Sequence, residues 1–161
     1  MKYEEFVTKF KSQSTNLSQG KQLSLAISVC KKLFFDYQEF SEKNNWGDTD
    51  LLLDAINLSE KFFSQKINVT TLIVLLPKID EITPDTEDFE NASYALNACR
   101  AVYETLEFLI DNKPEHIYNI GTYLTDTVDF KIQQDDELTE DQIDRHPLMV
   151  ETREYLIEAT K

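Results

Sequence analysis

Apolar residues recur every three or four positions along most of the chain, which is the spacing of a helix with one buried face. The clearest case is the segment 22–43. Its apolar positions are Leu23, Ala26, Ile27, Cys30, Leu33, Phe34, Tyr37 and Phe40. The spacing predicts a core helix over these residues.

The same period predicts helices in the rest of the chain. Their expected ranges are 2–12, 49–65, 69–82, 89–112 and 114–132, and a last helix begins at Pro147. Residues 1–17 are expected to form an N-terminal arm that packs on the remainder. The pattern therefore predicts an all-α protein in which residues 1–161 form a single-domain helical bundle of about six to eight helices.

Residues 68–84 are the ambiguous part of the chain. Val69–Val74 is rich in β-branched residues, which would suit a strand, but no second strand candidate is present to pair with it. We therefore expect Asn68 to cap a helix over 69–82. Whether Pro77 kinks one helix or divides it into two stays open at this point.

Short polar segments mark several expected helix ends. Gly47 is free to adopt positive φ, and Asp48 can cap the helix that follows it. Thr139–Gln142 has the form of a capping box. The acidic start of the helix over 89–112 is expected to complement the helix dipole. Gly121 lies on an apolar face, where the missing side chain permits a close helix crossing.

Composition narrows the class of protein. With 161 residues, 41% hydrophobic residues, three glycines and four prolines, the chain has the profile of a packed helical domain. The longest aliphatic run, Leu72–Leu76, is far shorter than the roughly 20 residues of a membrane span. The first residues carry Glu4 and Glu5 and no apolar h-region, so we expect no secretory signal and a cytoplasmic protein.

The net charge of −14 argues against nucleic-acid binding, because such binding depends on lysine and arginine side chains that neutralise phosphates. Cys30 and Cys99, the only cysteines, fall on apolar helix faces and are expected to be buried and inert. Asp135–Glu137 lacks the loop of a calcium site. No strained serine elbow and no phosphate-binding glycine loop is present.

The two histidines do not complete a metal motif along the sequence. The residues three positions before His116 and His146 are Lys113 and Ile143, so the Glu-x-x-His pair of di-iron bundles is missing. We therefore expect no metal site and no cofactor. The sequence favours a protein without catalytic activity, although an enzyme assembled from scattered residues stays open.

Several local patterns together resemble a known bacterial family. They are Cys30–Tyr37, Trp46–Asp48, Asp88–Phe89, Asn97–Val102 and Asp144–Leu148. In this order they resemble the family catalogued as domain of unknown function 416, also called YjaG-like. The resemblance implies an all-helical fold and a cytoplasmic bacterial origin. It implies no activity and no catalytic residues.

Two surface features are candidate binding sites for a partner. Trp46, the only tryptophan, lies in a polar turn and could anchor a partner, although a ring folded back on the helix ends is the alternative. The second feature is an acid-only stretch, which is either a solvated turn or a docking surface for a basic partner. Its members are Asp80, Glu81, Asp85, Glu87, Asp88 and Glu90.

Three functional hypotheses follow from these observations. The first is a cytoplasmic protein-binding or scaffold protein that acts through a protein partner or through self-association, for example as a homodimer. The second is an acidic inhibitor, such as an immunity-type protein, that blocks a basic partner. The third is a small-molecule enzyme or ligand carrier with a pocket between helices, which predicts a cleft where polar groups converge.

Overall fold

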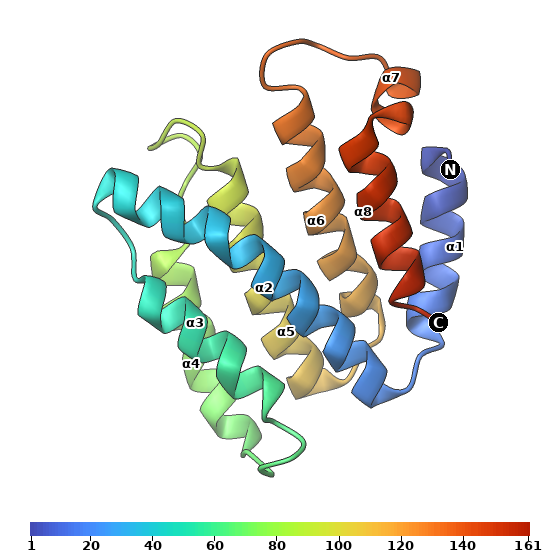
Figure 1. Cartoon of the computed structure of the whole chain (residues 1–161). Helices are drawn as coiled ribbons and strands as arrows, with labels where there is room; N and C mark the ends of the chain where they lie inside the picture. Colours follow the sequence, from blue (N-terminus) through green and yellow to red (C-terminus); the bar gives the residue numbers. More distant parts are fainter.

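The computed structural model describes residues 1–161 and contains eight α-helices and no strand, as the sequence predicted (Figure 1). The helices are α1 (Tyr3–Thr15), α2 (Gln19–Asn44), α3 (Thr49–Glu60), α4 (Val69–Ile82), α5 (Ser93–Asp111), α6 (Glu115–Ile132), α7 (Glu140–Arg145) and α8 (Pro147–Glu158). The all-α class is therefore confirmed.

The long helices α2 and α5 cross at the centre of the bundle, and α5 also packs along α6 (Figure 1). On one side, α6, α8 and α1 lie next to one another, so that both chain ends belong to this group. On the other side, α3 and α4 pack against α2 and α5. Helices α2 and α5 thus both contact the two halves.

One continuous apolar core joins these helices. Its largest fully buried side chains are Tyr37, Phe6, Phe10, Phe108, Leu33, Leu52, Ile56, Leu72, Ile79, Leu106, Ile117 and Ile120. Leu33 and Tyr37 belong to the apolar face that the sequence pattern identified in 22–43, and burial of these side chains is the main source of stability. Cys30 and Cys99 also lie in this core, and burial raises the pKa of each thiol to about 12.

The predicted capping residues occupy helix starts. Asp48 accepts a hydrogen bond from the Leu51 N–H (2.9 Å), and Asn68 accepts one from the Thr70 N–H (2.9 Å). Thr139 and Gln142 form a capping box at the start of α7. These side chains satisfy N–H groups that have no partner inside the helix.

Residues 69–82 form one helix, which settles the ambiguity of this segment. Pro77 lies within α4 on its exposed side, so the hydrogen bond that it cannot donate is lost near solvent. No strand forms, because the β-branched residues here have no second strand to pair with. The last turn of α4 carries Asp80.

The predicted helix boundaries differ from the structure at several places: α1 continues to Thr15, past the predicted end at 12, and α2 begins at Gln19. Two differences are larger. The third helix ends at Glu60, not at residue 65, and its continuation is a turn in which Lys66 has φ of 49°. The helix predicted from Phe89 begins only at Ser93, because Asn91 has φ of 57° and interrupts a right-handed helix. The acidic residues before Ser93 therefore lie in a loop and not in the first turn of α5.

Gly121 permits the close crossing that the sequence suggested. A β-carbon at this position would clash with Cε1 of Phe10, because the Phe10 ring of α1 occupies the space beside the α6 backbone. Phe6 stacks on Phe10 at 5.4 Å between ring centroids, which extends the contact along α1. No helix combines the length and the apolar character that a membrane crossing requires.

Candidate functional site

The predicted acidic residues do not converge on one point. Asp80 and Glu81 lie on the last turn of α4, and the other four lie in the connection 83–92, which we call the acidic loop. All six side chains are exposed, and none belongs to an ion pair within the chain. Inside the loop, the Asp85 side chain accepts a hydrogen bond from the Glu87 N–H (2.9 Å), which stabilises the turn.

Trp46 is half-buried and packs inward. Its ring centroid lies 5.1 Å from that of Phe89 and 6.1 Å from that of Phe40. Phe40 and Phe89 also contact each other edge to face at 5.2 Å. This is the arrangement of a ring folded back on the helix ends, and it ties the acidic loop to α2.

A second group of acidic residues does converge, at the turn between α5 and α6. Asn112 ends α5 in the left-handed conformation (φ 60°), and Asp111 accepts a hydrogen bond from the Lys113 N–H (2.9 Å). Pro114 precedes α6, where its fixed φ suits a helix start. The tight turn folds α6 back along α5, so the first turn of α6 faces the last turns of α5.

This folding places His116 between two carboxylates. The Nδ1–H of His116 donates to Oε2 of Glu104 (2.5 Å), and the Nε2–H donates to Asp111 (2.9 Å). Burial alone would lower the pKa of His116, but the hydrogen bonds with Asp111 and Glu104 outweigh it and raise the pKa above its ordinary value. We call Glu104, Glu107, Asp111 and His116 the hairpin cluster.

Glu104 is the most connected member of the hairpin cluster. While Oε2 accepts from His116, Oε1 accepts from Asn119 Nδ2 (3.3 Å) and from the Tyr123 hydroxyl (3.4 Å). All three donors come from α6. The carboxylate is therefore held in one orientation by side chains of the facing helix.

Glu107 lies one helical turn further along α5 and has no hydrogen-bond partner within the chain. One donor atom each of Glu104, Glu107 and His116 can be chosen so that all three lie within 4.8 Å of one another. Burial, followed by the charge of Glu104, raises the pKa of Glu107 above its ordinary value. The ionised form of Glu107 is thus disfavoured by its surroundings.

A hollow of about 300 Å³ adjoins the hairpin cluster between α4, α5 and α6. Its walls are Asp80, Thr83, Leu96, Cys99, Arg100, Tyr103, Glu104, Glu107 and Tyr123. Asp80 is the only predicted site residue that reaches it. Burial first, and then the charges of Asp80 and Glu107, raise the pKa of Tyr103, so its hydroxyl stays protonated at neutral pH.

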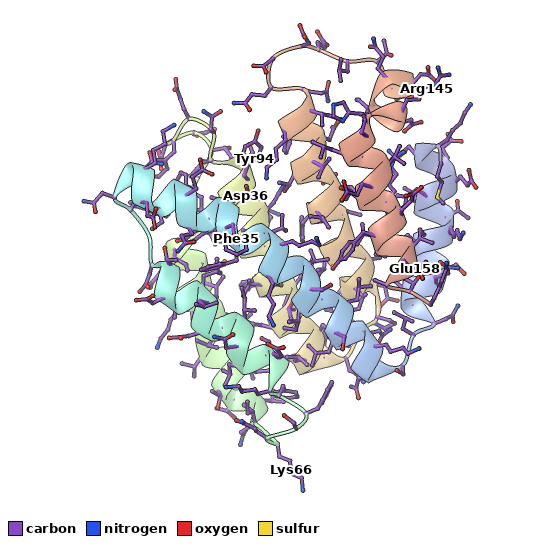
Figure 2. The ribbon with its side chains drawn as sticks, in the orientation of Figure 1. Phe35, Asp36, Lys66, Tyr94, Arg145 and Glu158 are labelled. Atoms are coloured by element: carbon purple, nitrogen blue, oxygen red, sulfur yellow. The ribbon has the colours of Figure 1, made fainter.

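Two other hollows are less organised. One, of about 450 Å³, lies between α2, α5 and α6, where Asp36 and Tyr94 lie near each other (Figure 2). Its Asp36 carboxylate is already paired with Lys131 (2.7 Å). The other, of about 250 Å³, lies near Arg153, whose guanidinium donates to Asp144 (2.7 Å) and to the Met1 carbonyl (2.9 Å). In each of these two hollows, one basic side chain is thus already paired with a carboxylate of the chain.

Comparison with known proteins gives the family. A family model described as a protein of unknown function (DUF416) matches residues 9–160, which is nearly the whole chain. The chain belongs to the DUF416 family. The resemblance inferred from Cys30–Tyr37 and the other local patterns is therefore confirmed.

A solved structure supports the same assignment. The crystal structure of a DUF416 family protein from Shewanella baltica OS155 has a TM-score of 0.81 and 25% identity to this chain, and the match covers 94% of this chain and 83% of that one. No curated protein matches the chain. DUF416 membership thus gives the fold, and it assigns no activity.

Within this DUF416 chain, sequence reasoning missed the hairpin cluster. It tested each histidine for a glutamate three positions earlier on the same helix, but the partners of His116 lie on the preceding helix. A usable signal was present. Glu104 and Glu107 are three residues apart and share one helix face, and a short turn that ends in Pro114 brings a histidine back against that face.

Proposed function

We propose that this protein is a ligand-binding protein, that its site is the hollow between α4, α5 and α6, and that its ligand carries positive charge. The single observation that carries this proposal is the convergence of three carboxylates, from Asp80, Glu104 and Glu107, on one hollow that contains a single cationic side chain, Arg100. Polar groups that converge on a cleft between helices are typical of a binding site.

Electrostatics supports a cationic ligand. The raised pKa of Glu107 arises from burial and from the neighbouring Glu104, and a bound cation would relieve both costs. Tyr103 and Tyr123 add aromatic rings to the walls, and aromatic faces attract cations. The ligand would therefore replace a repulsive arrangement of charges with an attractive one.

The test is a titration of isotope-labelled protein followed by NMR at physiological ionic strength. Hexaamminecobalt(III), putrescine and Zn²⁺ serve as cationic probes, and inorganic phosphate is the anionic control. We expect at least one cation to shift amide signals around Asp80, Glu104 and Glu107, with a loss of the shifts in Glu107→Gln. Glu87→Gln, which removes one charge from the acidic loop, is the matched control. Shifts confined to residues 83–92 for all cations would contradict the proposal.

A second candidate function is docking of a basic protein on the acidic loop, as the leading sequence hypothesis suggested. One observation favours it, which is that none of the six predicted acidic side chains is paired within the chain. Unpaired surface charge speeds the encounter with a partner of opposite charge.

Affinity purification at low and high salt tests the second candidate. The test variant replaces Glu87, Asp88 and Glu90 with lysine, and the matched control replaces Asp135, Asp136 and Glu137, which lie in the loop before α7. A stoichiometric basic partner that is lost only in the first variant is the expected result. Equal losses in both variants would indicate a response to net charge and not to the acidic loop.

A further inference from the structure

We propose that Glu104, Glu107 and His116 form a binding site for one divalent transition-metal ion at the turn between α5 and α6. This inference rests on the proposed function, because it names the cation that the hollow takes. The geometric basis is the set of donor atoms within 4.8 Å of one another, contributed by two facing helices. Three further observations concern how these donors are held.

The first observation is the orientation of Glu104. Asn119 and Tyr123 both donate to Oε1, so that Oε2 is the oxygen directed at His116. Hydrogen bonds to a metal-binding carboxylate are the usual means by which a protein fixes such a ligand. Glu104 is therefore oriented to offer one oxygen to an ion that lies beside Nδ1 of His116.

The second observation is the other side of the His116 ring. Nε2–H donates to the Asp111 carboxylate, at 2.9 Å from one oxygen and 3.0 Å from the other. Metal-binding histidines nearly always donate their second ring N–H to a carboxylate or carbonyl, which fixes the tautomer and the ring plane. Asp111 thus leaves Nδ1 of His116 as the nitrogen available to the ion.

The third observation is Glu107. This side chain forms no ion pair in the chain, lies near Glu104, and lines the hollow. A divalent ion between the two carboxylates would turn their mutual repulsion into attraction. Because Glu107 is not held by other groups, it can rotate to complete the site.

The donor set indicates the class of ion. An imidazole nitrogen suits Zn²⁺, Fe²⁺, Co²⁺ and Ni²⁺, whereas Mg²⁺ and Ca²⁺ prefer oxygen ligands alone. Metal–ligand distances of about 2.0–2.2 Å place two ligands of a tetrahedral ion roughly 3.4 Å apart. Side-chain rotation must therefore separate Oε2 of Glu104 from Nδ1 of His116, now 2.5 Å apart, and bring Glu107 closer to both. Three protein ligands leave a tetrahedral ion one position for water from the hollow.

The ion and a proton compete for the same nitrogen. In the ion-free protein Nδ1–H donates to Glu104, so binding of the ion releases this proton to solvent. Ion affinity should therefore increase with pH.

The experiment is titration of the whole chain with Co²⁺, followed by visible absorption, and with Zn²⁺ in competition with a chromophoric chelator. We expect one ion per chain and an absorption band typical of nitrogen and oxygen ligands. Both His116→Gln and Glu107→Gln should weaken Zn²⁺ affinity at least 100-fold, and Asp111→Asn about 10- to 100-fold. Glu87→Gln should change affinity less than twofold. Circular dichroism verifies that each variant is folded.

Hexaamminecobalt(III) separates this inference from the proposed function, because it carries charge but cannot exchange its ammonia ligands for protein side chains. If hexaamminecobalt(III) binds at the hollow while Co²⁺ and Zn²⁺ gain no affinity from His116, the metal site is wrong and the cation pocket stands. If hexaamminecobalt(III), Co²⁺ and Zn²⁺ all fail to bind, both proposals are wrong.

Discussion

The acidic loop and the hairpin cluster each contain several carboxylates, but their surroundings differ. In the acidic loop the side chains point into solvent, which screens their charges from one another. In the hairpin cluster two helices force Glu104, Glu107 and Asp111 around one histidine. Charge density along a sequence therefore does not identify a binding site. A binding site is indicated where side chains from two helices converge and hydrogen bonds fix their orientation.

The largest expected difference between the two regions is in stability. Replacing Glu104 with alanine leaves His116, Asn119 and Tyr123 without their acceptor, and should lower the free energy of unfolding by about 2 kcal/mol. Replacing Glu87 with alanine should change it by less than about 0.5 kcal/mol. Urea denaturation followed by circular dichroism measures both. Similar values for the two variants would contradict the contrast.

The second prediction concerns the contribution of His116 to stability, which depends on pH. The raised pKa of His116 means that its contribution to stability is complete below its ordinary pKa of about 6.5, and is lost as pH rises through the raised value. His116→Gln should therefore destabilise the protein more at pH 6 than at pH 9. Thermal melts in chelator-treated buffer test this. A destabilisation by His116→Gln that is the same at pH 6 and pH 9 would show that it arises from lost packing and not from lost charge interactions.

Replacement of Glu107 is expected to have a smaller effect on stability, and of the opposite sign. Because its pKa is raised, ionisation of Glu107 reduces stability as pH rises above its ordinary value. Glu107→Gln should raise the melting temperature by about 1–2 °C at pH 7 in the absence of metal ions. The gain should vanish near pH 4, where the wild-type carboxyl is protonated. A lower melting temperature at pH 7 would show that Glu107 is already stabilised within the chain.

The smallest effect is expected from the acidic loop itself. The triple variant Glu87→Gln, Asp88→Asn and Glu90→Gln keeps the Asp85 turn and should change stability by less than about 0.5 kcal/mol. Its Zn²⁺ titration should match that of the wild type. A large loss of Zn²⁺ affinity would mean that the acidic loop contributes to the metal site. It would contradict the proposed difference between the acidic loop and the hairpin cluster.

Most of the fold could be predicted from apolar spacing, because each helix buries one face in a common core. The predicted range 69–82 for α4 is confirmed, and so are the caps at Asp48 and Asn68. The errors fall where one backbone angle decides the outcome. Asn91 and Lys66 adopt positive φ, and nothing in the apolar pattern marks these positions as helix ends.

The hairpin cluster could not be predicted in the same way. The sequence showed Glu104, Glu107 and His116 individually, but their approach depends on how α6 rotates as it returns along α5. That rotation is set by the Asn112 turn and by core residues such as Ile117 and Ile120. A test of residue spacing along one helix cannot detect a site whose ligands come from two helices. The exposure of the acidic residues at 85–90, by contrast, follows from their charge, because an unpaired carboxylate is costly to bury.

The contact between Phe10 of α1 and Gly121 of α6 joins segments that are far apart in the sequence and are therefore synthesised at different times. Helix α1 leaves the ribosome before α6 and α8, yet the surfaces that it covers belong to these two helices. Phe6 and Phe10 of α1 therefore lack these neighbours until α6 and α8 have been synthesised. A nascent chain stopped before α6 would expose these two rings to chaperones, and completion of α8 would withdraw them.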